Sequence, residues 1–252
     1  MLQPNIPYKA DAEALLALVA STSLAGAFFD PQYRGVLDKL DYGNEGERQR
    51  ERALLPQMDE HQIGRIIREI GRVLRPSGHL FLWLDKFHLC EGITGWVTTS
   101  GMETVDLITW DKGRIGMGYR TRRRAEYLLV LQKPPKRAKG VWTRHDIPDV
   151  WHEKVSRSGP HTHGKPYGLI ASLVESTIPP GEVVLDPAAG SFVVRDAAMA
   201  QGRLFLGGDV VYGDTELPER LPSTDVAPVA AVKALRSRPR TALAAIPKAK
   251  GR

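Results

Sequence analysis

Two short apolar runs in this chain stop at the same dipeptide, Asp-Pro. The first is FFDP at residues 28–31, and the second is VLDP at residues 184–187. An apolar run without polar alternation is typical of a strand that is buried on both faces of a sheet. We therefore expect two core strands, each of which delivers an aspartate and a rigid proline turn to the end of the sheet.

Strand and helix patterns alternate around these two runs. Strands are predicted at residues 24–29, 79–84, 105–110, 126–131, 182–185 and 204–207. Helices are predicted from 3.6-residue periodicity at residues 14–19, 60–74, 168–176 and 192–201. Residues 75–78, Arg-Pro-Ser-Gly, are expected to break the second helix. The alternation indicates an α/β fold with a mostly parallel sheet, in which ligands bind beyond the carboxyl ends of strands.

The composition limits the class of protein and of partner. The chain of 252 residues has a formal net charge of +6, which favours a polyanionic partner but also fits a generically basic soluble protein. Its single cysteine, Cys90, cannot form an intramolecular disulfide and is expected to be a buried, inert thiol. We see neither a signal peptide nor an apolar run long enough to span a membrane, so a cytoplasmic protein without membrane partners is expected.

The run that ends at Asp186 leads into a glycine-bearing turn and a helix. Gly190 allows the backbone to approach a ligand closely, and the N–H groups at a helix N-terminus suit a carboxylate or phosphate. A second strand ends near Asp209, where an acidic side chain can hold the vicinal hydroxyls of a ribose. Taken alone, this pattern is a weak indication of a nucleotide site, because similar turns occur in many unrelated proteins.

The run that ends at Asp30 is the start of a segment that combines three chemical functions within four residues. Asp30 can accept a hydrogen bond from an exocyclic amine, and the turn at Pro31 leaves a backbone carbonyl as a second acceptor. Tyr33 can stack on a planar base. The segment therefore predicts a site for the amino group of a flat heterocycle. The alternative is that Asp30 only caps a helix or turn.

FFDPQY at residues 28–33 resembles the catalytic Asp-Pro-Pro-Tyr motif of the amino-group DNA methyltransferases, and VLDPAAGS at residues 184–191 resembles their Asp-Pro-Phe-x-Gly-Ser-Gly cofactor motif. Four further segments are similar to that family: YKADAEALLALV at 8–19, GRVLRPSGHLFLWL at 71–84, EYLLVLQKP at 126–134 and HTHGKPYGLIASLV at 161–174. The catalytic motif precedes the cofactor motif, as in the permuted beta class of this family.

This resemblance covers roughly residues 8–212. It implies a Rossmann-like fold that depends on S-adenosylmethionine, with a mixed, mostly parallel sheet of seven strands and helices on both faces. It also implies a stand-alone modification enzyme of the prophage type, connected with restriction-modification.

The resemblance assigns roles to individual residues. The implied catalytic set is Asp30, Pro31, Gln32 and Tyr33. The set expected to bind S-adenosylmethionine is Asp11, Asp30, Lys165, Pro166, Asp186, Pro187, Ala188, Gly190, Ser191, Phe192 and Asp209. Within this set Asp11 is expected near the adenine moiety and Lys165 near the methionine end. The chain departs from the family motifs at Gln32, Ala188 and Phe192, where a second proline, an aromatic residue and a glycine usually stand.

The implied reaction moves a methyl group to N6 of an adenine that is flipped out of double-stranded DNA, without a metal. An aspartate in the first position of the catalytic motif favours adenine, whereas the N4-cytosine enzymes of the family more often carry serine. The motif does not settle the base, and N4-cytosine methylation is the alternative. Two further classes of protein also fit the motifs: a catalytically silent DNA-binding protein, and an enzyme that acts on RNA or on a free nucleobase. The expected partner is duplex DNA, and a homodimer is an additional option.

The chain is predicted to form a methyltransferase catalytic domain over residues 1–213 and a basic, disordered tail over residues 214–252. The tail adds phosphate affinity or has no dedicated role. In this class target recognition usually lies in the segment that corresponds to residues 133–164. This segment is short here, so a short or relaxed recognition sequence in DNA is expected.

Two clusters of polar side chains complete the sequence-based predictions. The densest basic cluster consists of Arg120, Arg122, Arg123 and Arg124. It is predicted to contact DNA phosphates, and the alternative is a plain solvated face. Three histidines have a spacing that fits no common metal-ligand set and are expected to be solvated: His152, His161 and His163.

Overall fold

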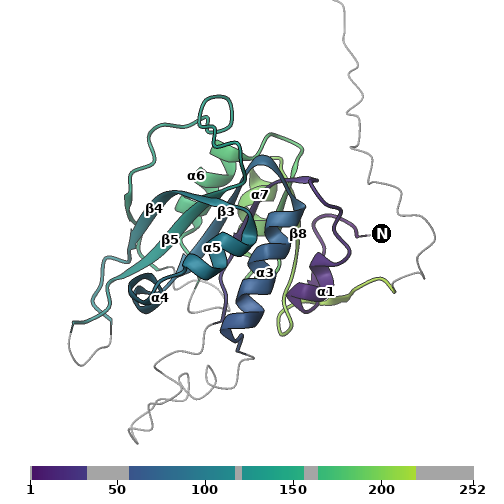
Figure 1. Cartoon of the computed structure of the whole chain (residues 1–252), viewed down its shortest axis with the longest axis horizontal. Coiled ribbons are helices and arrows are strands. Elements are labelled where there is room, and N and C mark those ends of the chain that lie inside the picture. The colour runs from purple at the N-terminus through teal and green to yellow at the C-terminus, as the bar shows by residue number, and fades with distance from the viewer. Residues whose placement is uncertain (1, 33–56, 117–120, 156–163, 220–252) are drawn as a thin grey trace, which may run out of the picture.

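The computed structural model describes residues 2–32, 57–116, 121–155 and 164–219 (Figure 1). In this part of the chain nine strands form one sheet, in the order β6-β4-β5-β3-β2-β7-β8-β1-β9. The strands are β1 Pro7–Lys9, β2 Leu24–Phe29, β3 Leu74–Leu84, β4 Glu103–Asp111, β5 Ala125–Gln132, β6 Val150–His152, β7 Val183–Asp186, β8 Leu204–Gly208 and β9 Thr215–Glu216. Among these strands, only β5 runs antiparallel to its neighbours, β3 and β4. The predicted mixed, mostly parallel sheet is confirmed.

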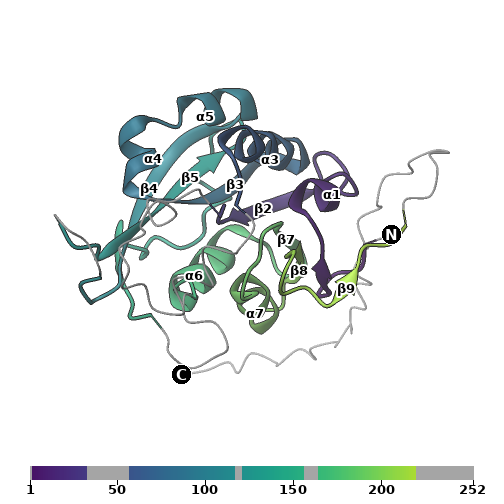
Figure 2. The ribbon, with the colours of Figure 1, turned by 90° about the horizontal axis from the view of Figure 1, so that it is seen from below.

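Helices cover both faces of the sheet (Figure 2). One face carries α1 (Ala12–Leu16), α3 (Glu60–Val73), α4 (Lys86–Glu91) and α5 (Thr94–Ser100). The other face carries α6 (Tyr167–Thr177) and α7 (Val193–Ala200). Each face has its own cluster of buried apolar side chains, as expected for an α/β fold. No helix in the described part of the chain is long and apolar enough to cross a membrane.

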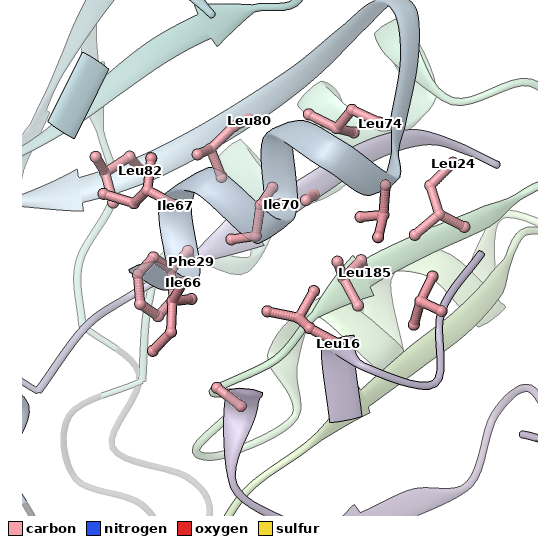
Figure 3. Packing of buried hydrophobic residues seen from close by; sticks show 14 of the residues in the cluster. Leu16, Leu24, Phe29, Ile66, Ile67, Ile70, Leu74, Leu80, Leu82 and Leu185 are labelled. Atoms are coloured by element: carbon pink, nitrogen blue, oxygen red, sulfur yellow. The ribbon is translucent and has the colours of Figure 1, made fainter. Parts of the chain in front are cut away.

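The apolar stripe of α3 fastens the central strands from one side. Asp59 caps the helix by accepting a hydrogen bond of 2.7 Å from the Gln62 N–H. The buried stripe recurs every three or four residues, at Ile63, Ile66, Ile67 and Ile70. These side chains lie in one cluster with Phe29 of β2 and Leu80 of β3 (Figure 3). Burial of each isoleucine contributes about 1.5–3 kcal/mol relative to exposure, so α3 holds β2 and β3 firmly together.

All six individually predicted strands are present, but the sheet has nine strands in the described residues rather than the seven that the resemblance implied. Strands β1, β6 and β9 are only two or three residues long. Strand β6 lies within residues 133–164, and β9 lies beyond residue 213, so the sheet extends into the segment predicted as a tail. Residues 220–252 of that segment lie outside the described residues.

Two local predictions need correction. The helix does end before Arg75, but β3 begins at Leu74 and runs through residues 75–78. The turn is accommodated as an irregularity in the pairing with β2, whose register shifts between Leu24 and Gly26. The predicted burial of Cys90 is wrong: its thiol is exposed, because α4 is a short helix with no buried residue.

The order of the strands positions the ligand site. Strands β2 and β7 are parallel neighbours in the middle of the sheet, with Ala27 paired to Leu185. The chain continues from β2 to β3 on one side and from β7 to β8 on the other. The strand order therefore reverses between β2 and β7, and open α/β sheets bind ligands in the crevice beyond the carboxyl ends at such a point.

Candidate active site

Three aspartates gather at the carboxyl edge of the sheet. Asp30 follows β2, Asp186 ends β7 and Asp209 follows β8, and these strands are parallel neighbours. Asp186 is 5% exposed, whereas 42% of the Asp30 side chain is exposed. The two Asp-Pro turns therefore lie side by side in the fold, although they are far apart in the sequence.

The carboxyl group of Asp186 is held in an unfavourable electrostatic environment. Burial raises its pKa well above the usual value, and the negative charges of Asp30 and Asp209 raise it further. Two groups offset only part of this rise in pKa: the Ala188 N–H, 3.3 Å from Oδ1 of Asp186, and the more distant Lys165 ammonium. Such a group of carboxylates favours a ligand that brings positive charge.

The turn after β7 is tied to β8. Gly190 has a φ of +49° and donates its N–H to Oδ2 of Asp209 at 3.1 Å. The Ala189 N–H reaches the carbonyl oxygen of Gly208 at 2.9 Å. Pro187 is buried, and Ala188 and Ser191 are half-buried along the same turn. The predicted cofactor segment is therefore a fixed loop between two strand ends.

Phe192, which stands where the family motif has a glycine, has a left-handed backbone conformation. Its φ of +57° and ψ of +26° lie in the left-handed region, which costs a side-chain-bearing residue roughly 1–2 kcal/mol. The ring is buried and packs edge to face on Phe205, with 6.0 Å between centroids. The side chain thus belongs to the core between α7 and the sheet, and its burial offsets the backbone strain.

The catalytic turn that the sequence predicted is described as far as Gln32. Pro31 is buried directly after β2. The carbonyl oxygen of Gln32 accepts a hydrogen bond of 2.9 Å from the Met58 N–H, which ties this turn to the segment that enters α3. Tyr33, the fourth residue of the predicted catalytic set, lies outside the described residues.

Lys165 joins the two halves of the site. It precedes α6, whose N-terminal boundary residue is the buried Pro166. Its Nζ lies 3.0 Å from Oδ1 of Asp30 and 2.9 Å from Oε2 of Glu126. Burial alone would lower the pKa of Lys165, but the charges of these two carboxylates outweigh it and raise that pKa, so the ammonium stays charged.

Glu126 is a residue of this site that sequence reasoning missed. It lies near the start of β5, half-buried, and its second oxygen is 3.0 Å from Nζ of Lys112. Burial alone would raise its pKa, but Lys165 and Lys112 lower that pKa to about 2. The sequence offered one signal for Glu126, because it is a charged residue directly before the apolar run YLLVL.

The arginine cluster separates into residues with different partners. Strand β5 pairs antiparallel with β3, so residues 122–124 lie at the same edge as the ends of β2 and β7. Arg124 clamps both oxygens of Asp111, at 2.6 and 2.7 Å. Arg122 donates to the carbonyl of Gly116, Arg123 lies 5.7 Å from the ring centroid of Phe87, and Arg120 lies outside the described residues.

Two further residues that the sequence singled out, Asp11 and His152, each have a partner in the fold. Asp11 is exposed just after β1, the neighbour of β8, and its Oδ1 caps α1 by accepting the Glu13 N–H at 2.8 Å. His152 pairs with Asp111, whereas His161 and His163 lie outside the described residues. Within the described residues, no group of three or more His, Cys, Asp or Glu side chains is placed to hold a metal ion.

The comparisons with known proteins place the chain in a family. Residues 28–211 match the model of the N6/N4 DNA methylases, and the chain belongs to this family. It is 53% identical over 204 residues to the Type II methyltransferase M.HhaII of Haemophilus parahaemolyticus, and the match covers 80% of this chain and 89% of that protein.

Two solved structures share the fold. The S-adenosylmethionine complex of the protein TTHA0409 from Thermus thermophilus has a TM-score of 0.55 and 23% identity, over 82% of this chain and 88% of that one. The cytosine-N4-specific PvuII DNA methyltransferase has a TM-score of 0.59 and 12% identity, over 82% and 84% of the two chains.

Proposed function

We propose that this chain transfers a methyl group from S-adenosylmethionine to N6 of an adenine flipped out of double-stranded DNA. The observation that carries the proposal is the adjacency of the Asp30 and Asp186 turns, because a methyl donor at one turn and a base at the other lie within mutual reach. Membership in the DNA methylase family supports the substrate. The S-adenosylmethionine complex of the Thermus protein supports the donor.

The carboxyl edge of the sheet suits S-adenosylmethionine chemically. Its three aspartates match a ligand that carries a sulfonium and an ammonium charge. At Gly190, no described atom lies within 4 Å of the place where a Cβ would stand, which leaves room for a ligand against the backbone. In this proposal the methionine end is held by Asp186, Pro187, Ala188, Gly190 and Ser191, the ribose by Asp209, and the adenine side by Asp11. The bound cofactor supplies a methyl group that its positively charged sulfur activates.

Asp30 and Pro31 act on the target amine. An exocyclic amine is a poor nucleophile, because its lone pair is delocalised into the ring. Hydrogen bonds from its two N–H groups to the Asp30 carboxylate and to the Pro31 carbonyl favour a tetrahedral nitrogen. The same acceptors stabilise the positive charge that develops on the nitrogen. The remaining requirement is alignment of the nitrogen about 3 Å from the methyl carbon.

The DNA must deliver the base to this edge. The amine is inaccessible within a duplex, so the base is flipped out, and Tyr33 is proposed to stack on it. Arg122 and Arg123 are proposed to contact phosphates, because both are exposed and lie at the catalytic edge. Arg124 is left out of this role because its guanidinium already clamps Asp111.

Adenine is proposed over N4-cytosine because the chain carries Asp30 where the cytosine enzymes of the family more often carry serine. Mass analysis of nucleosides from treated duplex DNA distinguishes N6-methyladenine from N4-methylcytosine. N4-methylcytosine as the sole product would replace the adenine proposal. The absence of both products would favour the catalytically silent alternative.

Asp30→Asn tests the catalytic role. The substitution keeps the shape of the side chain but removes the charge that accepts from the amine, so kcat should fall about 10²–10³-fold, as when one preorganised hydrogen-bonding group is removed. The dissociation constant for S-adenosylmethionine, measured by calorimetry, should change less than about threefold. Asp196→Asn on α7, an exposed position, is the matched control. An Asp30→Asn enzyme with unchanged kcat would refute the assignment.

A further inference from the structure

Four side chains form a line of alternating charge across the catalytic edge: Asp30, Lys165, Glu126 and Lys112. We call this line the charge chain. Successive charged groups lie 3.0, 2.9 and 3.0 Å apart. The four residues come from segments separate in sequence: the end of β2, the entry to α6, β5 and the end of β4. The line therefore runs from the proposed catalytic aspartate after β2, past β3, to β5 and β4.

The ammonium of Lys165 is held from three directions. Asp30 and Glu126 contact it from two sides, and the ring centroid of Trp83 lies 4.5 Å from Nζ. Only 18% of the Lys165 side chain is exposed. A lysine carries its charge on a flexible four-carbon stem, so it has a defined position only where fixed partners hold it. Glu126 provides such a partner, because it stands on β5, an interior strand between β3 and β4.

The position of Lys165 in turn constrains Asp30. The ammonium contacts Oδ1 of Asp30, so the rotation of this carboxylate depends on where the ammonium lies. Asp30 follows directly after β2, and its side chain is 42% exposed, so packing alone fixes it less than it fixes a core residue. The low pKa of Glu126, about 2, means that its charge persists at neutral pH.

We infer that Glu126 is a positioning residue for methyl transfer, which holds the Lys165 ammonium and, through it, the Asp30 carboxylate in the orientation that accepts the target amine. This inference rests on the proposed function. Glu126 itself touches neither the base nor the methyl donor. Its loss should consequently affect the rate of the chemical step and leave the binding of both substrates nearly unchanged.

Glu126→Gln tests the inference, because glutamine keeps the size and the acceptor oxygen but removes the charge. We expect kcat for methylation of duplex DNA to fall about 10–100-fold, since a small misplacement of reacting groups has effects of this size. The KM values for DNA and for S-adenosylmethionine should stay within about threefold of wild type. Glu126→Asp, which restores the charge on a shorter side chain, should recover part of the lost kcat.

Glu103→Gln is the matched control. Glu103 begins β4 at the opposite edge of the sheet, where it forms an exposed pair of 2.7 Å with Lys136. This variant should keep the wild-type kcat. Thermal melting and circular dichroism establish that each variant is folded. If Glu126→Gln does not fold, Lys112→Gln takes its place: it loosens Glu126 from the far side and should lower kcat less, with unchanged KM.

Two results would overturn the inference: a folded Glu126→Gln enzyme with kcat within twofold of wild type, or a loss confined to the KM for S-adenosylmethionine. In the replacement experiment, an unchanged kcat of Lys112→Gln would do the same. Failure of the proposed function is separate, because wild-type protein would then produce no N6-methyladenine.

Discussion

Asp186 is a residue whose burial opposes stability. The folded protein raises the pKa of its carboxyl through burial and through the charges of Asp30 and Asp209, whereas the unfolded chain leaves it near 3.8. Well below pH 3.8 the group is protonated in both states and has no effect. As the pH rises from 3.8 to the folded-state pKa, the unfolded chain releases its proton first, so the free energy of unfolding falls.

Asp186→Asn should therefore stabilise the protein in the absence of cofactor. At pH 7 its Tm should exceed that of the wild type, and the difference should shrink to nothing as the pH is lowered to about 3.5. A change of about 1 kcal/mol moves the Tm of a domain of this size by roughly 2–4 °C, which calorimetry resolves. Asp196→Asn, at an exposed position, is the control. A lower Tm at pH 7 for Asp186→Asn would contradict this account.

The sequence predicted the residues that belong to a continuous motif better than it predicted their partners. Asp30 and Asp186 stand out because each ends an apolar run. The pairing of Arg124 with Asp111 depends on how β4 and β5 align, and the pairing of Glu126 with Lys165 depends on a contact between β5 and the entry to α6. No local pattern encodes such contacts, so Arg124 could not be separated from its neighbours before the fold was known.

At the scale of elements, length decided what could be predicted. Strands β2 to β5 and the helix α3 are long enough to show an apolar run or a helical period. Strands β1, β6 and β9 have only two or three residues, so they show no period. They exist because a neighbouring strand offers its edge: β1 lies along β8, β6 along β4 and β9 along β1.

The contact between α3 and α5 yields a prediction about two glycines. A Cβ at Gly71 of α3 would collide with the backbone carbonyl of Ser100 at the end of α5, whereas one at Gly95 of α5 would meet no described atom within 4 Å. Gly71→Ala should destabilise the protein by about 1–3 kcal/mol through overpacking. Gly95→Ala should stabilise it by about 0.5–1 kcal/mol, as usual within a helix.

Urea unfolding of both variants checks this prediction. Since both substitutions replace a helical glycine by alanine, helix propensity cancels between them, and the difference in midpoint reports the close approach of the two helices. Equal effects of the same sign at the two positions would mean that α3 and α5 do not pack this closely.

At the scale of the whole molecule, the positive charge is concentrated at one end of the chain. The whole chain has 35 basic and 29 acidic side chains. Residues 220–252 carry eight of the basic and one of the acidic side chains, which leaves 27 basic and 28 acidic side chains in residues 1–219. The net charge of +6 is thus a property of the last 33 residues, and the part that contains the proposed active site is nearly neutral. Attraction to the phosphate backbone should therefore depend mainly on this basic segment.

Removal of residues 220–252 should separate DNA affinity from catalysis. At low salt the Kd for nonspecific duplex should rise at least about tenfold, because fewer counterions are released on binding. The slope of the logarithm of the association constant against the logarithm of the salt concentration should become shallower. The change should be at most about seven units, if all eight basic side chains contact phosphates. At saturating DNA, kcat should stay within about twofold, because strand β9 and the charge chain are retained.

Fluorescence anisotropy across a salt series measures the Kd and its salt dependence. A full-length variant with glutamine at the same eight positions is the matched control. If truncation lowered kcat while the neutralised variant did not, the segment would act through contacts other than charge.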